Sequence, residues 1–362
     1  MSVAAMGIFR FFVCLFLLLS SSVSLSNNMY ESFGYQLSSG GNHNCVIDDT
    51  GVVCWGRNLE GQTNIPELIN PRSVYAGGFH TCAIDDSGVT CWGRNDSGQI
   101  NVPILTNPVK LSLGYHHTCA LDDTGVVCWG RNDSGQIDVP ALTSPREISL
   151  GYHHTCALDD TGIVCWGANA NFPGISDLVN PLQISVGQTH TCVLIDNDVE
   201  CLGGNYYGQT NIPELVNPTQ IAANGEFSCS LHESGVECWG RNLEGQISVP
   251  NLNTPVQVSM GFRHSCAFDS SGVVCWGSTE FGATNVPELS FAFDEDDTDT
   301  NVTSAVLDID ANGNFDALTD GLIILRYAFG LRGQSLIDDV IPEDANRTEA
   351  ADIEAHIESL LP

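Results

Sequence analysis

The chain alternates short apolar runs with polar turns, in a pattern that recurs along most of its length. In the clearest copy, an apolar run at 117–121 is followed by a turn at 122–125 and a second apolar run at 126–130. Asp122 favours this turn because its side chain can bond nearby backbone, and Gly125 can take the positive φ that closes it. A further short run at 110–113 precedes the pair. The pattern predicts a three-stranded β unit whose last two strands form a hairpin.

Cysteines mark the same repeat. Fourteen of the 15 cysteines, all except Cys14, form seven pairs whose members are nine positions apart. The first cysteines of successive pairs are 37 positions apart, except for one step of 36 between Cys156 and Cys192. With a four-residue turn, Cys119 faces Cys128 at a separation that suits a disulfide. We therefore predict one disulfide within each hairpin: Cys45–Cys54, Cys82–Cys91, Cys119–Cys128, Cys156–Cys165, Cys192–Cys201, Cys229–Cys238 and Cys266–Cys275. Zinc is the alternative, but this spacing is unusual for zinc ligands.

A three-stranded unit cannot bury both of its own faces, so the units must pack on one another. The sequence predicts an all-β seven-bladed β-propeller over residues 27–293. A tryptophan directly follows the second cysteine in every copy except the fifth, which has Leu202, and we expect it to fill the space between blades. A linear solenoid is the alternative, but it would need atypical end repeats, and the first and last copies look regular.

The net charge limits the possible partners of the chain, and its N-terminal segment predicts where the protein is located. The net charge of −32 excludes binding to a phosphate backbone, so we expect no nucleic-acid partner. Residues 1–26 match a signal peptide, with Arg10 before an apolar run at 11–19 and small residues after it. This run is too short to span a bilayer, and no later segment is long enough. We expect a secreted or cell-surface protein with no transmembrane span.

The copies resemble the repeat of the regulator of chromosome condensation family, in its short bacterial form. The likeness rests on Gly114, residues 117–121, Gly125, Trp129-Gly130, Asn132 and Gly135-Gln136, with their counterparts in the other copies, and covers about residues 35–290. The resemblance implies a seven-bladed propeller. It does not imply the family's nuclear exchange-factor activity for an exported, acidic, cysteine-rich chain, because fold does not fix function.

Two positions vary freely between copies, four and three residues before each first cysteine. In a closed ring they lie on one rim, since the repeats are related by rotation. Aromatic residues and arginine dominate protein-binding hot spots. We expect a patch that binds an extracellular protein or glycan at Phe79, Tyr115, His116, Tyr152, His153, Phe262 and Arg263. The alternative is that these aromatic side chains pack between blades.

No catalytic motif stands out: the chain has no Gly-x-Ser-x-Gly elbow, His-Glu-x-x-His helix or phosphate-binding loop. We therefore predict a non-enzymatic binding protein. A hydrolase or lyase acting on polysaccharide or peptide through a rim histidine is one alternative, and a purely structural surface protein is another. A histidine also recurs two residues before the first cysteine, and its repetition favours a structural hydrogen bond over a metal site. Tyr206 and Tyr207 are a weaker recognition candidate.

The tail carries a separate pattern. An acidic linker at 294–303 leads to a small helical module at 304–362, in which oxygen-bearing side chains and Gly313 follow the spacing of a calcium loop. The predicted ligands are Asp308, Asp310, Asn312, Asn314, Asp316 and Asp320, with Asn314 acting through its carbonyl. Thr319 occupies the usual final ligand position, so Thr319 and Asp320 remain alternatives there. The segment is similar to the first half of a dockerin domain, which implies calcium as cofactor and a cohesin-like partner.

Overall fold

The computed structural model describes residues 35–168, 170, 172–196 and 198–291, and in the tail residues 323, 334–337 and 349–360. The chain divides into two compact units, one of which spans Gly34–Ala292 and is called the propeller unit below. The predicted signal peptide, acidic linker and calcium ligands lie outside the described residues.

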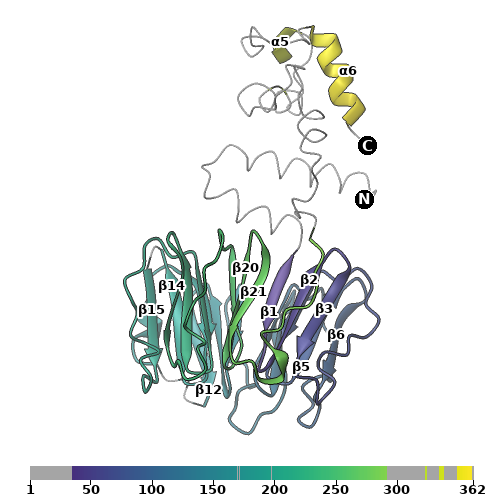
Figure 1. Cartoon of the computed structure of the whole chain (residues 1–362). Helices are drawn as coiled ribbons and strands as arrows, with labels where there is room; N and C mark the ends of the chain where they lie inside the picture. The colour runs from purple at the N-terminus through teal and green to yellow at the C-terminus, as the bar shows by residue number, and fades with distance from the viewer. Residues whose placement is uncertain are drawn as a thin grey trace. The chain divides into compact units, whose positions relative to one another are not determined.

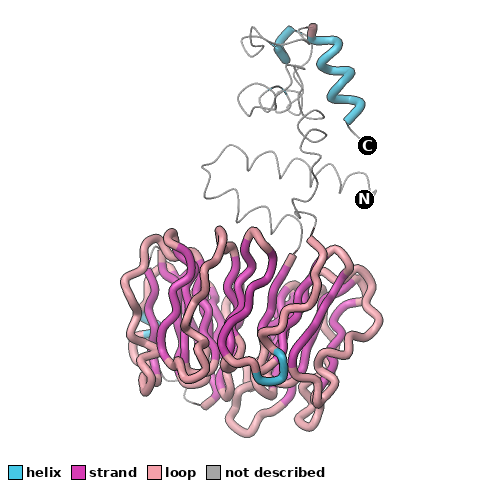
Figure 2. Tube along the Cα trace, in the orientation of Figure 1, coloured by secondary structure: helices cyan, strands magenta, loops and turns pink. Residues whose placement is uncertain are grey.

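Seven three-stranded antiparallel sheets, or blades, make up the propeller unit, and in each the strand order follows the chain. The sheets stand side by side (Figure 1), joined by loops (Figure 2). The strands are β1 (Gln36–Ser39), β2 (His43–Asp48), β3 (Gly51–Gly56), β4 (Ser73–Ala76), β5 (His80–Asp85), β6 (Gly88–Gly93), β7 (Lys110–Leu113), β8 (His117–Asp122), β9 (Gly125–Gly130), β10 (Glu147–Leu150), β11 (His154–Asp159), β12 (Gly162–Gly167), β13 (Pro181–Val186), β14 (His190–Ile195), β15 (Asp198–Gly203), β16 (Gln220–Asn224), β17 (Phe227–His232), β18 (Gly235–Gly240), β19 (Gln257–Met260), β20 (His264–Asp269) and β21 (Gly272–Gly277).

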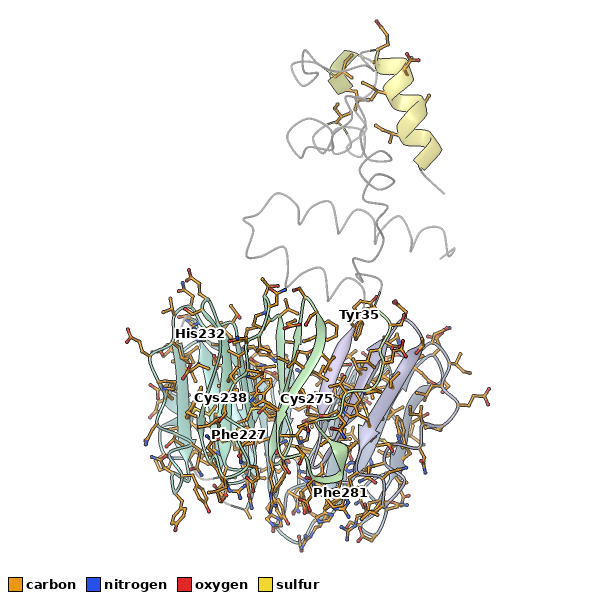
Figure 3. All side chains as sticks on the ribbon, viewed as in Figure 1. Tyr35, Phe227, His232, Cys238, Cys275 and Phe281 are labelled. Atoms are coloured by element: carbon orange, nitrogen blue, oxygen red, sulfur yellow. A yellow bond between two sulfur atoms is a disulfide. The ribbon has the colours of Figure 1, made fainter. Side chains whose placement is uncertain are left out.

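The hairpin register is the one that the cysteine spacing predicts. In the third blade Cys119 faces Cys128, with Cα atoms 4.1 Å apart and the sulfurs bonded. All seven predicted disulfides are present, each inside one blade, so the zinc alternative is wrong. Figure 3 labels one cysteine from each of the last two pairs.

The hairpin turn is held by its aspartate. The Oδ1 atom of Asp122 accepts a bond of 2.7 Å from the backbone N–H of Thr124, and Oδ2 accepts one of 2.8 Å from that of Thr106. Gly125 takes a φ of 116°, which a residue with a Cβ rarely adopts. One carboxylate thus fixes both the turn and the connection that enters the blade.

Tryptophan fills the space between blades, as the sequence predicts. Trp129 is 7% exposed and packs in one cluster with Cys82 and Ile84 of the preceding blade. Its indole N–H donates to the carbonyl of Gln99 at 2.9 Å, so its polar atom is satisfied where it is buried. Leu202 replaces it in the fifth blade and packs only partly buried.

The seventh blade bonds to the first. The backbone N–H of Phe262 donates to the carbonyl of Gly41 at 3.0 Å, and that of Ser39 donates to Ser259 Oγ at 2.8 Å. The equivalent bond joins the fifth and sixth blades, from Gln188 N–H to the Gly225 carbonyl at 2.8 Å, and Gly41 N–H bonds to the Gly77 carbonyl at 2.9 Å between the first two blades. The ring is therefore closed, which is consistent with a seven-bladed propeller and rules out a linear solenoid.

The tail unit contributes two described helices, α5 (Gln334–Ile337) and α6 (Ala350–Leu360). They contact each other, and Leu336, Ile353 and Ile357 are buried. Among the helices that the structure describes, none combines the length and apolar character needed to cross a membrane.

Candidate functional site

The two ends of the propeller unit differ in what they carry. Because His43 pairs with Gly56, the connection between first and second strands and the loop after the third strand share one end, here called the loop face. The hairpin turns lie at the opposite end, here called the turn end. Figure 3 shows Phe281 at the lower, loop-face end and His232 at the upper, turn end.

Side chains at the first variable position, four residues before each first cysteine, lie near the axis of the ring. Tyr115 stacks on Tyr152 with ring centroids 4.0 Å apart, and the Phe262 ring lies 5.5 Å from that of Tyr115. Burial and the neighbouring Tyr152 raise the pKa of Tyr115 to about 12. Gly41 and Gly78 take this position in the first two blades, and together they line a cavity of about 40 Å³ with the three rings. Three half-buried aromatic rings thus lie over the axis.

Glycine is required at some of these axial positions by close approach. A Cβ atom on Gly78 would lie 2.8 Å from the carbonyl oxygen of Tyr115 and 2.9 Å from its Cδ2 atom. The Tyr115 ring of the third blade fits there because Gly78, its neighbour in the second blade, has no side chain. The cluster is therefore asymmetric, although the backbone ring is nearly regular.

The second variable position lies beneath the loops. Phe79 and His116 are buried, His153 is half-buried, and Arg263 is exposed. The guanidinium carbons of Arg57 and Arg94 sit 4.7 and 5.1 Å from the centre of the Phe79 ring. The structure therefore brings all seven predicted residues to one face, but Phe79 and His116 support that face from below.

Arginine side chains border the aromatic cluster. A search for positions that vary between copies does not find most of them, because arginine recurs at the same position in several blades. Arg57, Arg94, Arg131 and Arg241 each follow the Trp-Gly pair of a blade, and with Arg263 they make up five of the 12 basic residues in the chain. Each lies within ion-pair distance of a carboxylate on the same face, such as Glu60 beside Arg57. Their position directly after Trp-Gly was the sequence signal that could have found them.

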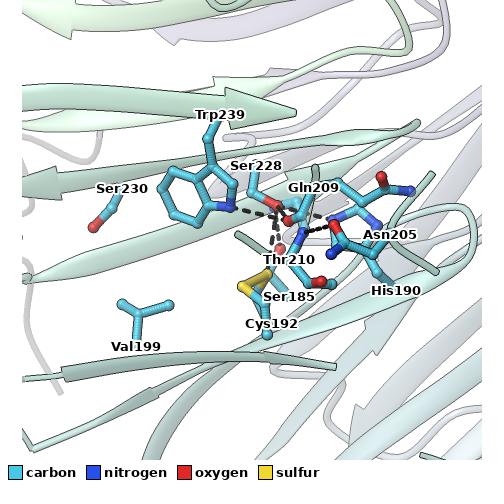
Figure 4. The surroundings of a disulfide bond; sticks show 12 residues. Ser185, His190, Cys192, Val199, Asn205, Gln209, Thr210, Ser228, Ser230 and Trp239 are labelled. Carbon is cyan, nitrogen blue, oxygen red and sulfur yellow. Dashed lines mark hydrogen bonds between the residues drawn. A yellow bond between two sulfur atoms is a disulfide. The ribbon is translucent and has the colours of Figure 1, made fainter. Parts of the chain in front are cut away.

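The recurrent histidines are structural. His190 Nε2 lies 2.8 Å from Ser228 Oγ in the next blade, and that hydroxyl lies 3.2 Å from the Gln209 carbonyl, which also accepts from Trp239 (Figure 4). The same histidine-to-hydroxyl contact recurs between other neighbouring blades. These rings join adjacent blades, which agrees with the structural interpretation.

Burial keeps these histidines neutral. It lowers the pKa of His43, His80 and His117 to about 3. It lowers the pKa of His154, His190 and His264 to about 4. A group held neutral inside the core is poorly suited to act on a substrate.

The loop-face histidines are also poor candidates for acid–base chemistry. Burial, with Arg94 and Arg131 nearby, lowers the pKa of His116 to about 4. Within the described residues, the buried Nδ1 atoms of His116 and His153 have no hydrogen-bond partner. The described residues also contain no group of three or more metal-ligating side chains. The geometry suits recognition by packing and hydrogen bonding.

Comparison with known proteins matches this architecture. A family model described as the regulator of chromosome condensation (RCC1) repeat matches residues 35–62, 72–99, 109–136, 146–172 and 256–283. The unmatched fifth and sixth copies are those with Leu202 in place of tryptophan and Phe227 in place of histidine. No curated protein sequence gives a significant match.

Two solved plant structures share the fold. The entire ectodomain of the receptor kinase CR4 from Physcomitrella patens superposes with a TM-score of 0.58 at 24% identity, over 68% of this chain and 73% of that one. The CRINKLY WD40 ectodomain of the Arabidopsis thaliana receptor kinase ACR4 gives a TM-score of 0.55 at 21% identity, over 69% of this chain and 98% of that one. The five matches show that the chain carries regulator of chromosome condensation (RCC1)-type repeats, within a fold of seven three-stranded units that each hold one disulfide.

Proposed function

We propose that this chain is a secreted or cell-surface protein that binds another extracellular protein through the loop face and catalyses no reaction. The observation that carries the proposal is the clustering there of stacked aromatic rings and arginines, the residue types that dominate protein-binding hot spots. Rigid blades hold these side chains in place, so little conformational entropy is lost on binding.

Location outside the cell is supported by the covalent chemistry. Seven disulfides persist in an oxidising compartment and are rare in the cytosol. Residues 1–26 supply a signal peptide in this proposal. The fold is shared with two receptor ectodomains, and the same use of a propeller for recognition outside the cell is part of the proposal.

The tail is proposed to bind calcium. Asp308, Asp310 and Asp316 would supply carboxylates, and Asn312 and Asn314 neutral oxygens, as a calcium ion prefers. A cohesin-like partner for the tail follows only from the dockerin resemblance. Titration calorimetry of the full chain with calcium should show binding that Asp310→Ala abolishes, and equal heats for both proteins would reject this part.

Photo-crosslinking tests the main proposal. A benzophenone amino acid is placed in the full chain at Leu243 on the loop face, or at Asp123 on the turn end, and each protein is irradiated with the surface and secreted proteins of the producing cells. We expect discrete protein adducts from position 243 only. Adducts only from position 123, equal adducts from both, or none at all would overturn the proposal; the last result would fit a glycan partner.

A further inference from the structure

The cavity on the ring axis, here called the axial cavity, is lined by aromatic rings and by glycine backbone. Its aromatic rings are those of Tyr115, Tyr152 and Phe262, and its glycines come from five different blades. Of the described residues that line it, none is charged. The group that it can hold therefore depends on backbone atoms and aromatic faces.

The backbone N–H groups of this lining already donate to other atoms of the protein. Gly41 N–H donates to the Gly77 carbonyl at 2.9 Å, and Tyr115 N–H donates to the Gly151 carbonyl at 3.3 Å. Twelve of the 15 lining residues donate from their backbone N–H to a protein acceptor in this way. An anion is bound by free N–H groups, so the lining is poorly suited to one.

Carbonyl oxygens of the lining, by contrast, keep spare capacity. A carbonyl has two lone pairs, and those of Gly77, Gly114 and Gly151 each accept one N–H from the preceding blade. These oxygens are packed against glycines of that blade: a Cβ atom on Gly40 would lie 2.2 Å from the Gly77 oxygen, and one on Gly114 would lie 2.6 Å from the Gly151 oxygen. The lining thus offers acceptors from several blades around one axis.

The aromatic rings add a second feature that favours a cation. The face of an aromatic ring carries negative potential and attracts an ammonium group. Tyr115, Tyr152 and Phe262 belong to the loop-face connections between first and second strands and are only partly buried, so a partner bound at the loop face can reach them. The net charge of −32 also attracts cations towards the chain from a distance.

The size of the axial cavity limits its ligand to a compact group. A water molecule needs about 10–15 Å³, so a cavity of about 40 Å³ holds roughly three groups of that size. This is enough for an ammonium nitrogen and the last methylenes of a lysine side chain. The arginines that border the aromatic cluster do not take this place, because Arg57 and Arg94 contact the Phe79 ring and pair with Glu60 and Asp96.

We propose that the axial cavity accepts the ammonium end of a lysine side chain from the protein bound at the loop face. This inference rests on the proposed protein-binding function and names one group of the partner. The ammonium would donate to the glycine carbonyl oxygens, and the lysine methylenes would pack on Tyr115, Tyr152 and Phe262.

Nuclear magnetic resonance on the isotope-labelled full chain at pH 7 tests the cavity itself. The probes n-butylammonium chloride, n-butanol and potassium chloride are titrated separately, because they supply a charged alkyl chain, its neutral equivalent and a bare cation. We expect saturable shifts at the amides of Tyr115, Tyr152 and Phe262 with n-butylammonium alone. Equal shifts with n-butanol would indicate purely apolar binding, and equal shifts with potassium would indicate an inorganic ion site; either result would overturn the inference.

Variants measure the contribution of the aromatic rings. Tyr152→Ala should weaken n-butylammonium binding about fivefold because one ring face is lost. Tyr206→Ala is the matched control: Tyr206 is on the same face and 87% exposed but does not line the cavity, so binding should stay within about twofold. Phe262→Leu, which keeps an apolar side chain, should also weaken binding and serves if Tyr152→Ala does not fold. Equal effects of the cavity and control variants would contradict the inference.

Peptides test whether the ammonium comes from a lysine side chain. Two fluorescein-labelled peptides of glycine and serine, one with a central lysine and one with norleucine in its place, are compared by fluorescence anisotropy on the full chain. The lysine peptide should bind at least about fivefold more tightly and be displaced by n-butylammonium; no preference for lysine would reject the inference. Crosslinking from Leu243 without n-butylammonium binding would reject it and leave the proposed function standing, whereas failure of both would reject both.

Discussion

Acidification from pH 7 to about pH 5 is expected to destabilise the propeller unit, because six histidines between the blades are buried in the neutral form. They are His43, His80, His117, His154, His190 and His264, each fully inaccessible to solvent. Burial lowers the pKa of each to about 3 or 4, from 6.5 for the free side chain. The unfolded chain therefore binds protons below pH 6.5 that the folded chain cannot bind.

The sign and size follow from this difference. Since the unfolded state holds more protons, stability is complete above pH 6.5 and is lost as the pH falls from 6.5 towards the folded-state values. One pKa unit corresponds to about 1.4 kcal/mol, so at pH 5 each histidine removes about 2 kcal/mol. Six such groups together remove on the order of 10 kcal/mol, which is comparable with the whole stability of an ordinary domain.

Urea unfolding at a series of pH values between 7 and 5 measures the effect, with the disulfides intact. The free energy of unfolding should fall with a limiting slope of at least about 8 kcal/mol per pH unit, the value for six protons, because the lowered pKa of His116 acts in the same direction. His80→Phe is the matched variant, because Phe227 fills the equivalent site in the sixth blade with no solvent exposure. It should reduce the slope by about one sixth, whatever it does to stability at pH 7. A free energy that stays constant between pH 7 and 5.5 would refute the argument that these rings are neutral and buried.

Three further predictions concern the blades. Trp129→Leu, which copies Leu202, should cost about 2–4 kcal/mol in urea unfolding through a cavity and a lost bond to Gln99, and a cost below about 0.5 kcal/mol would show that the indole is not inter-blade filling. Cys119→Ser/Cys128→Ser should lower stability by about 2–3 kcal/mol while the ring stays folded by circular dichroism, since the disulfide closes only a short loop; complete unfolding would contradict this. Asp122→Ala should cost about 1–3 kcal/mol by thermal unfolding because it leaves two backbone N–H groups without their acceptor, and an unchanged melting temperature would refute the turn assignment.

The blades could be predicted from the sequence because their determinants are local. The alternation of apolar runs and turns gave the strands, and a four-residue turn places Cys119 opposite Cys128 without any knowledge of the remaining chain. The number of units and their regular ends favoured a closed ring. The Phe262–Gly41 bond establishes that closure, and it joins residues far apart in sequence.

The candidate site was predicted only in part, because its geometry depends on the ring. Sequence comparison placed Tyr115 and His116 together on one rim, but in the ring Tyr115 turns to the axis and His116 is buried beneath the loops. The search for positions that vary between copies also missed Arg57, because several repeats have arginine at that position. The apolar character of Leu59 and Leu243 was visible in the sequence, but their exposure depends on tertiary structure.

Backbone amide exchange across the closing joint tests most directly whether the seven blades form a closed ring. The N–H of Phe262 donates to the Gly41 carbonyl at 3.0 Å, and the N–H of Gln188 makes the equivalent bond to the Gly225 carbonyl at 2.8 Å within the ring. Exchange measured by nuclear magnetic resonance on the full chain at neutral pH should show comparable protection at both amides. Exchange of the Phe262 amide at the rate of an unstructured peptide, with Gln188 still protected, would show that the ring is open between the seventh and first blades.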